Sequence, residues 1–543
     1  MRKLGFVLLL PILSAGAALG LSACGSSVGG KEGGTLTGSY ASYPDYLDPG
    51  LSYTLEGWTA MYNTYIPLLT YAHANGVEGS KLVPGLAKSL PEISNGGKTY
   101  TLTLQKGLKY SDGTPIKASD FASTVERLFK LNSPGSTFFS AIVGAEKFAE
   151  TKSGGIPGIK TDDKTGKIVI DLVQPRGTFT NELGMLFVAL VPADTPAKNL
   201  SANPPPGAGP YVITKAEPGR GWTYERNPYW AKANAKLVPE VPSGHVNKIE
   251  ISVIRNDSTQ VSNVEQGKTD WMQPPVPSDQ YAALKDKYEG TQFRVEQPIN
   301  VYYFWMNTAE PPFDDLKVRQ AVNYAVDTEA LERIYSGSLA ATHQILPPGM
   351  PGHEEFDLYP HDMAKAEALL EEANPSDRDI TVWTDNESPN NEAGAYYEDV
   401  LNKLGFNAKL KTLNADNYFT VIGNLSTPDL DTGWTSFFED YPHPNDFFQP
   451  QLTGESIFPT FNTNFAQIDV AKLNEKVAKL GEEELGPEQE SEYAELDKEY
   501  MEEAPWVPYG NNTVSTFVSS AIDLDKVIYN PTFGQDLTSF QFK

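Results

Sequence analysis

The sequence predicts a mixed α/β fold, and three observations support this prediction. First, the segments 98–105, 167–173 and 248–253 alternate apolar with polar residues, which is typical of strands with one buried face. Second, other segments carry apolar residues every three or four positions, as in helices that bury one side. Third, the chain has 543 residues, which is too long for one hydrophobic core and long enough for two or three domains.

The strand predictions depend on apolar residues that share one face of each segment. Those residues are Tyr100, Leu102 and Leu104 in the first strand, Ile168, Ile170 and Leu172 in the second, and Ile249, Ile251 and Val253 in the third. The strands are interleaved with helices in no simple order along the chain. This interleaving favours α/β domains over separate all-α and all-β parts.

The helix predictions depend on five apolar stripes. They consist of Phe121, Val125 and Leu128 after Ser119; Val318, Ala321, Val322 and Ala325 behind Asp314 and Asp315; Met363, Ala366, Leu369 and Leu370 after Asp362; Val470, Leu473, Val477 and Leu480; and Tyr493, Leu496 and Tyr500. We expect Ser119 to cap the first helix, because a hydroxyl can accept a hydrogen bond from a free N–H at a helix start.

The first 23 residues have the pattern of a signal peptide. A basic start at 1–3 precedes an apolar run at 4–19, and small residues follow the run, as at a cleavage site. The run is shorter than the roughly 20 residues that span a bilayer. A transmembrane anchor is the alternative interpretation, although the segment lacks a cytoplasmic stop signal.

Cys24 is the only cysteine of the chain. An unpaired thiol is a hazard in an exported protein. A single cysteine is therefore best explained if its sulfur carries a covalent modification such as a lipid. Residues 21–24 resemble the lipobox of bacterial lipoproteins, whose cysteine is acylated and becomes the mature N-terminus. The resemblance implies lipidation of Cys24, a flexible tether at 24–34 rich in Gly and Ser, and a body anchored at the extracytoplasmic face of the bacterial cell membrane.

Composition and motifs exclude several classes of function. The formal net charge of −27 argues against a nucleic-acid partner, which would need clustered Lys and Arg. Outside the Gly- and Ser-rich tether, no Gly-x-Ser-x-Gly motif occurs, and no pair of the six histidines has the spacing of a helical zinc site. We therefore expect no enzyme, metal or cofactor. A carboxylate pair of the glycosidase kind stays open in so acidic a chain.

Five groups of short motifs follow one another along nearly the whole chain. They occupy 82–87 with 98–102, 108–115 and 118–121; 207–211 with 227–230; Asn307 with 311–315, 318–322 and 325–327; 362–366 with 369–370; and 504–508. Each group is weak alone, but their order resembles that of the oligopeptide- and dipeptide-type extracellular solute-binding proteins (family 5) of bacterial ABC importers. Ala208 and Trp506 depart from the residues common in the family.

The resemblance implies a periplasmic-binding-protein-like α/β fold of the class II or cluster C type, with two lobes, a hinge and a third, smaller inserted domain. We expect the N-terminal lobe to comprise 35–77, 200–295 and 504–543. The inserted domain would be 78–199, and the C-terminal lobe 296–503. A ligand would bind between the two lobes.

Asp440 is the first candidate for ligand contact, and it lies in the aromatic-rich segment 434–442. In peptide-binding relatives an Asp in a similar segment pairs with the N-terminal ammonium of the peptide. The dipeptide Asp440-Tyr441 aligns Asp440 with that Asp. The same resemblance makes Phe437 and Trp434 candidates for the cleft wall. The alternative is that Asp440 caps a turn before Pro442, and both interpretations stay open.

Four further aromatic residues are candidates because aromatic rings supply contact area at low entropic cost. Tyr302 and Tyr303 resemble ligand-facing aromatics of the family, but alternation along a strand allows at most one to face the cleft. Trp271 follows a short polar segment at an expected edge between the lobes, and Tyr43 lies near the mature start. Packing in a core is the alternative for each.

The sequence thus predicts a monomeric, lipid-anchored receptor that captures a short peptide and delivers it to the permease subunits of an ABC importer. An oligosaccharide or another small solute is the alternative within the same class, since tryptophan and tyrosine rings can stack on sugars. A metal chelate is disfavoured by the scattered histidines. A secreted, lipid-anchored hydrolase is the remote alternative from another class.

Overall fold

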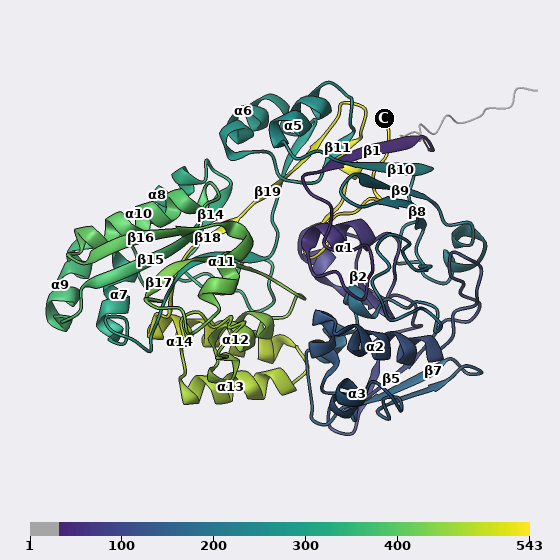
Figure 1. Cartoon of the computed structure of the whole chain (residues 1–543), viewed down its shortest axis with the longest axis horizontal. Helices are drawn as coiled ribbons and strands as arrows, with labels where there is room; N and C mark the ends of the chain where they lie inside the picture. The colour runs from purple at the N-terminus through teal and green to yellow at the C-terminus, as the bar shows by residue number, and fades with distance from the viewer. Residues whose placement is uncertain (1–31) are drawn as a thin grey trace, which may run out of the picture.

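The computed structural model describes residues 32–543, apart from the side chain of Asp416. The signal peptide predicted at 1–23, Cys24 and most of the predicted tether at 24–34 lie outside the described residues. Within the described part, no helix is long and apolar enough to cross a membrane. The chain forms two large lobes side by side, with a smaller unit beneath the first lobe (Figure 1).

The first lobe is built on a seven-stranded mixed sheet. Its strands are, in spatial order, β12 (Phe293–Glu296), β19 (Val514–Val518), β11 (Trp271–Met272), β1 (Thr35–Tyr40), β10 (Lys248–Val253), β9 (Gly221–Arg226) and β8 (Tyr211–Glu217). The central strand β1 runs parallel to β10 and β11. Helices α5 (Asp257–Glu265) and α6 (Ser278–Tyr288) pack at the β11–β12 end.

The second lobe is built on a six-stranded mixed sheet. Its strands are β14 (Leu339–Ala341), β18 (Trp506–Asn512), β13 (Asn300–Met306), β17 (Thr432–Phe438), β15 (Asp379–Asp385) and β16 (Asn407–Leu413). All seven residues of β13 are buried. Its helices are α7 (Leu316–Ala325), α8 (Thr328–Ile334), α9 (Met363–Ala373), α10 (Asn390–Lys403), α11 (Ala415–Ile422), α12 (Asn445–Leu452), α13 (Ala471–Glu482) and α14 (Pro487–Glu503).

The smaller unit contains a four-stranded antiparallel sheet that lies within 78–199, the segment expected to be inserted. Its strands are β4 (Glu92–Ser94), β5 (Thr99–Thr103), β7 (Lys167–Asp171) and β6 (Ile159–Asp162). Helices α2 (Ser119–Leu131), α3 (Ala145–Thr151) and α4 (Phe179–Glu182) accompany them. Elements that join this unit to the first lobe are α1 (Leu55–Met61), β2 (Leu69–Tyr71), β3 (Leu82–Pro84), β20 (Tyr529–Asn530) and β21 (Gly534–Gln535).

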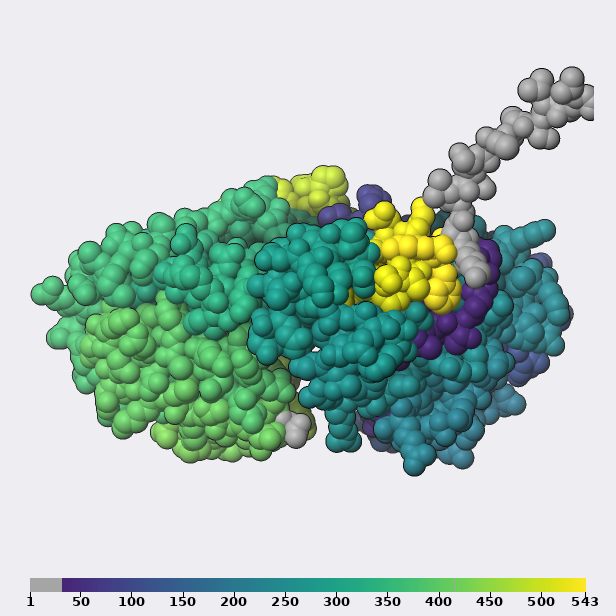
Figure 2. Space-filling view, turned by 90° about the horizontal axis from the view of Figure 1, so that it is seen from above, coloured from purple at the N-terminus to yellow at the C-terminus, as the bar shows by residue number. Residues whose placement is uncertain are grey.

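The chain crosses between the two large sheets at two neighbouring places, 297–299 and Thr513. Strand β18 pairs with β13 and β14, and β19 pairs with β11 and β12. The segment 504–512 therefore contributes a strand to the second lobe, whereas we expected 504–543 in the first. We propose Thr513 as the boundary. The residues after it return to the first lobe, beside β1 (Figure 2).

Hydrogen bonds between the two crossings hold them together. The side chain of Asn300 donates to the carbonyl oxygen of Asn512 over 2.9 Å and accepts from its N–H over 2.8 Å. The side chain of Asn511 donates to the carbonyl oxygen of Asn300 over 2.7 Å. Because Asn300 is fully buried, these bonds satisfy polar groups that water cannot reach.

The three predicted strands are confirmed as β5, β7 and β10, and the predicted stripes lie on α2, α7, α9, α13 and α14. The predicted cap at Ser119 is wrong. Helix α2 has Ala118 at its N-cap, and the hydroxyl and N–H of Ser119 both donate to Asp163. The free N–H is thus satisfied by a carboxylate from another segment, which leaves the Ser119 hydroxyl no capping role.

Candidate ligand-binding site

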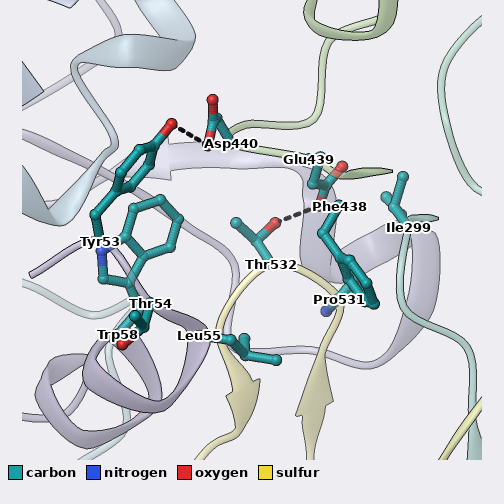
Figure 3. A pocket seen from close by; sticks show the side chains of 10 residues that line it. All are labelled: Tyr53, Thr54, Leu55, Trp58, Ile299, Phe438, Glu439, Asp440, Pro531 and Thr532. Atoms are coloured by element: carbon teal, nitrogen blue, oxygen red, sulfur yellow. Dashed lines mark hydrogen bonds between the residues drawn. The ribbon is translucent and has the colours of Figure 1, made fainter. Parts of the chain in front are cut away.

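A cavity of about 190 Å³ lies between the two lobes. Ten residues line it: Tyr53, Thr54, Leu55, Trp58, Ile299, Phe438, Glu439, Asp440, Pro531 and Thr532. In Figure 3, Tyr53 and Trp58 form one side, Phe438 and Ile299 the opposite side, and the carboxylates of Asp440 and Glu439 border the space between them. Both lobes and the segment that crosses between them therefore contribute to this wall.

The wall from the first lobe is a loop that leads into α1. Thr54 caps this helix by accepting the N–H of Gly57 over 3.2 Å. The carboxylate of Asp45 accepts the N–H of Tyr53 over 2.6 Å and the hydroxyl of Ser52 over 2.7 Å. These bonds fix the backbone of the loop, so that the Tyr53 ring is held toward the second lobe.

The wall from the second lobe is the end of β17 and the two residues that follow it. Asp440 Oδ1 accepts the hydroxyl of Tyr53 over 2.7 Å, and this bond joins the two lobes. The N–H of Asp440 donates to Asp446 Oδ2 over 2.7 Å. Oδ2 of Asp440 accepts no hydrogen bond from the described residues, so this oxygen is free for a ligand.

Glu439 makes the second bond between the lobes at this cavity. Its Oε1 accepts the hydroxyl of Thr532 over 2.7 Å. The residue is only 7% exposed, and its Oε2 has no hydrogen-bond partner among the described residues. Burial, followed by repulsion from Asp440, raises the pKa of Glu439 to about 8, although the Thr532 hydroxyl opposes the shift.

The carboxylates at this site have no basic neighbour to compensate them. Burial raises the pKa of Asp440 to about 6, and burial together with Asp440 and Glu439 raises the pKa of Asp446 well above its usual range. Within the described part of the chain, the charges that shift the pKa values of these three carboxylates are all acidic. Burial also lowers the pKa of His443 to about 3, so its imidazole is neutral and supplies no charge.

A second set of contacts, away from the cavity, joins the smaller unit to the second lobe. The N–H of Gly177, in the smaller unit, donates to the carbonyl oxygen of Gly481 in α13 over 2.9 Å. The hydroxyl of Tyr100 donates to Glu484 over 3.3 Å. Together with the bonds at the cavity, they describe a closed arrangement of the lobes.

Three predicted site residues, Asp440, Phe437 and Trp434, lie on or next to β17. Asp440 lines the cavity, as described above. The Phe437 ring packs edge-on against Phe447 at 5.0 Å, on the side of the strand away from Phe438. Trp434 is buried in the second lobe and donates to the hydroxyl of Tyr509 over 2.7 Å.

Tyr302 and Tyr303 both lie on the buried central strand β13. Tyr303 stacks on Trp506 with 3.6 Å between ring centroids, inside the core of the second lobe. Tyr302 packs edge-on against Phe438, one of the cavity residues, at 6.2 Å. Of the two, Tyr302 is thus the one next to the cavity wall.

Trp271 and Tyr43 lie in the first lobe, apart from the cavity lining. Trp271 is fully buried and packs against Tyr40 and Phe540 at 5.8 and 5.4 Å. Tyr43 is half-buried and packs edge-on against Trp222 at 5.5 Å. Of the seven aromatic and acidic candidates, Asp440 alone is among the residues that line the cavity in this arrangement.

Sequence reasoning missed Tyr53, Glu439 and Thr532. Glu439 directly precedes Asp440 and could have been found from that position. Tyr53 and Thr532 are separated by 532 − 53 = 479 positions, and no sequence signal joins them. Among the described residues, no group of three or more His, Cys, Asp or Glu side chains is suited to hold a metal ion.

Several curated proteins are similar to this chain over most of their length. The Heme-binding protein A of Haemophilus influenzae is 27% identical over 462 residues, which cover 79% of each chain. The Dipeptide-binding protein of Escherichia coli is 27% identical over 461 residues, which cover 79% of this chain and 81% of that protein.

Solved structures show the same fold. A clavulanic acid biosynthesis oligopeptide binding protein 2 is 24% identical, with a TM-score of 0.86 over 94% of this chain and 96% of that chain. The periplasmic binding protein DppA from Helicobacter pylori, solved with the peptide STSA, has a TM-score of 0.74 at 20% identity and covers 94% of this chain and 98% of its own. The fold is therefore the mixed α/β fold of the cluster C binding proteins, as predicted.

A family model supplies the remaining comparison. The model for the bacterial extracellular solute-binding proteins, family 5, matches residues 81–458, which is more than half of the chain. Members of this family bind solutes for ABC importers outside the cytoplasm and are not enzymes. The chain therefore belongs to the family 5 extracellular solute-binding proteins of bacterial ABC importers.

Proposed function

We propose that the protein is a lipid-anchored receptor that captures a short peptide between its lobes and delivers it to the permease. The observation that carries the peptide assignment is the interlobe cavity with Asp440 at its border and no basic side chain to compensate it. A ligand that brings its own positive charge supplies what the site lacks.

The N-terminal ammonium of a peptide fits Asp440 in charge and in hydrogen bonding. Tyr53 uses one carboxylate oxygen of Asp440 and leaves Oδ2 for a donor from the ligand. An ammonium–carboxylate bond is a charge-assisted hydrogen bond, and at the half-buried Asp440 each ion would satisfy the other's hydrogen bonds. The cavity of about 190 Å³ is smaller than the roughly 300–1,000 Å³ of pockets for drug-sized ligands, which favours a short peptide.

Several of the relatives support the same ligand class, whereas one is named Heme-binding protein A. Another is named a Dipeptide-binding protein, and the solved structures include complexes with the peptides STSA and RPPGFSPFR. A neutral oligosaccharide could stack on Tyr53, Trp58 and Phe438. It would, however, leave the carboxylates without a counter-charge, which disfavours it.

The test begins with native mass spectrometry of the protein extracted in detergent, before and after partial unfolding to release bound material. We expect a mixture of short peptides. In calorimetric titration with a released peptide, Asp440→Asn should weaken binding by at least about 30-fold, because it leaves the buried ammonium unpaired. Glu240→Gln, an exposed change with the same loss of charge, is the control and should bind as the wild type does.

Two results would contradict the peptide assignment. One is the release of an oligosaccharide, which would move the assignment to a sugar receptor. The other is unchanged peptide affinity in Asp440→Asn, which would leave Asp440 as a residue of a turn. Tyr53→Phe, which keeps the charge of Asp440 and removes only the bond between the lobes, should weaken binding less than Asp440→Asn.

The lipid anchor is proposed from Cys24 and the three residues before it. In bacteria that express the protein, Cys24→Ser should abolish incorporation of labelled fatty acid and move the protein from the membrane to the soluble fraction. Labelling that persists in Cys24→Ser would contradict this part of the proposal, since the chain has no other cysteine.

A further inference from the structure

We propose that Glu439 is a second cation site in the cavity, so that the receptor selects peptides whose first residue has a basic side chain. The inference rests on the proposed function, because it takes the N-terminal ammonium at Asp440 as the first cation. It names the substrate class more narrowly: short peptides with two positive charges close together at their N-terminus.

The first argument is the unsatisfied oxygen of Glu439. Thr532 donates to Oε1, whereas Oε2 has no partner among the described residues although the side chain is more than nine-tenths buried. Buried acceptors are nearly always paired, and leaving a carboxylate oxygen unpaired is costly. Because Glu439 lines the cavity, a donor on the ligand can complete its hydrogen bonds.

The second argument is the balance of charge around Glu439. The ionisable groups that interact with its charge are Asp440 and Asp446 from the second lobe and Tyr71 and Tyr529 from outside it, and Tyr53 lines the same cavity. Each of these groups is acidic. The nearby His443 is neutral, and Arg176 forms its ion pair with Glu182 over 2.7 Å.

The N-terminal ammonium of a peptide compensates the charge of Asp440 but leaves Glu439 without a counter-charge. Asp440 and Glu439 are adjacent, and both line the same small cavity (Figure 3). The α-ammonium and the side-chain ammonium or guanidinium of a basic first residue are carried by one amino acid, so both can enter this cavity together. A peptide with an uncharged first side chain would leave Glu439 in one of two states, ionised without a partner or protonated. In neither state does Glu439 gain the attraction of a charged pair.

The experiment compares two dipeptides that differ in one charge. Lysyl-alanine and norleucyl-alanine have first side chains of similar length, and only the first has a side-chain ammonium. In calorimetric titrations of the whole protein at pH 7.5, we expect the wild type to bind lysyl-alanine about 10- to 100-fold more tightly, as a charged hydrogen bond implies. Glu439→Gln should remove this preference by weakening lysyl-alanine alone.

Asp440→Asn and Glu240→Gln separate this inference from the function on which it rests. Asp440→Asn should weaken both dipeptides, and Glu240→Gln should weaken neither. If the wild type binds both dipeptides equally and Asp440→Asn weakens both, the peptide function stands and the role of Glu439 is wrong. If neither dipeptide binds the wild type although native mass spectrometry releases other short peptides, the role of Glu439 is wrong and the peptide function stands, whereas both proposals fail if no peptide is released either.

The wild-type preference is a test that needs no variant. It keeps the proposal falsifiable if Glu439→Gln fails to fold. A preference for lysyl-alanine that survives in a folded Glu439→Gln would also overturn the assignment, because some other group would then recognise the second charge.

Discussion

At the scale of single residues, two adjacent carboxylates control the chemistry of the cavity. Asp440 and Glu439 accept hydrogen bonds from Tyr53 and Thr532 of the other lobe, and burial raises the pKa of both carboxylates. A raised carboxyl pKa means that the group stays protonated up to a higher pH in the ligand-free protein. A cationic ligand favours the ionised form, so binding releases protons near and below that pKa.

Peptide affinity should therefore depend on pH. The pKa of Asp440 in the ligand-free protein is about 6, so the ligand must displace a proton below that pH. For norleucyl-alanine, whose first side chain is uncharged, we expect affinity to rise by up to about tenfold per unit between pH 5 and 6 and then to level off. Titrations at pH 5, 6, 7 and 7.5 measure this profile.

Asp440→Asn is the control for this profile, since it should remove the rise near pH 6. The other acids nearby, Asp446 and Glu439, remain in that variant and would still respond to pH. A wild-type affinity that is constant from pH 5 to 7.5 would contradict an ionised Asp440 in the bound state.

At the scale of single residues, the sequence could predict only some of the residues that line the cavity. Asp440 could be predicted because its aromatic neighbours form a local motif. Tyr53 and Thr532 could not, since their nearness to Asp440 and Glu439 depends on the folding of two lobes. The aromatic rings were ambiguous for a physical reason: Trp434, Tyr303 and Trp271 have the same apolar surface whether they face a ligand or a core.

At the scale of elements, the contact between the smaller unit and α13 determines how closely the lobes approach. A β-carbon on Gly177 would lie 1.7 Å from the carbonyl oxygen of Glu483, just past the end of α13. Such an overlap with backbone cannot be relieved by turning a side chain. Gly177 is therefore required for the closed arrangement.

We expect Gly177→Ala to weaken peptide binding by about tenfold or more, because it lowers the fraction of molecules that can close. Small-angle scattering with saturating peptide should give a larger radius of gyration for this variant than for the wild type. Gly486→Ala is the control, since its β-carbon would meet only the flexible side chain of Gln489. Wild-type affinity and radius in Gly177→Ala would show that closure does not need this contact.

Sequence analysis succeeded for elements whose signals are local. Helices α7 and α9 begin after Asp315 and Asp362, whose carboxylates accept N–H groups of the first turn. It failed for Ser119, because Asp163 of a distant hairpin binds the residue instead. The position of β18 was also missed, since the partners of a strand are set by the tertiary fold.

At the scale of the whole molecule, the two lobes are joined by neighbouring crossings of the chain. Asn300 forms hydrogen bonds to both main-chain groups of Asn512, and all of this pairing is buried or half-buried. Closing and opening must therefore take place about a paired set of strands rather than a single linker. The family resemblance predicts two lobes joined by a hinge. Because β18 pairs in the second lobe and β19 in the first, we propose that Thr513, which lies between them, is part of that hinge.

Asn300→Ala should lower the free energy of unfolding by about 1–3 kcal/mol, because it leaves the polar groups of Asn512 without their partners. We also expect faster release of bound peptide, measured by stopped-flow fluorescence, because the two crossings are no longer held together. Asn402→Ala is the matched control, since Asn402 also makes two bonds to main-chain groups, but both within the second lobe. Equal release rates in the two variants would rule out a special role for Asn300.

The return of the chain to the first lobe after Thr513 has a consequence for biogenesis. Strand β19 completes the seven-stranded sheet, and Thr532 completes the cavity wall. A chain that emerges from a translocation channel N-terminus first exposes Tyr53 long before β19 and Thr532 have left the channel. If the chain is exported in this way, a ligand cannot be captured between the lobes until the residues after Thr513 have docked on the first lobe.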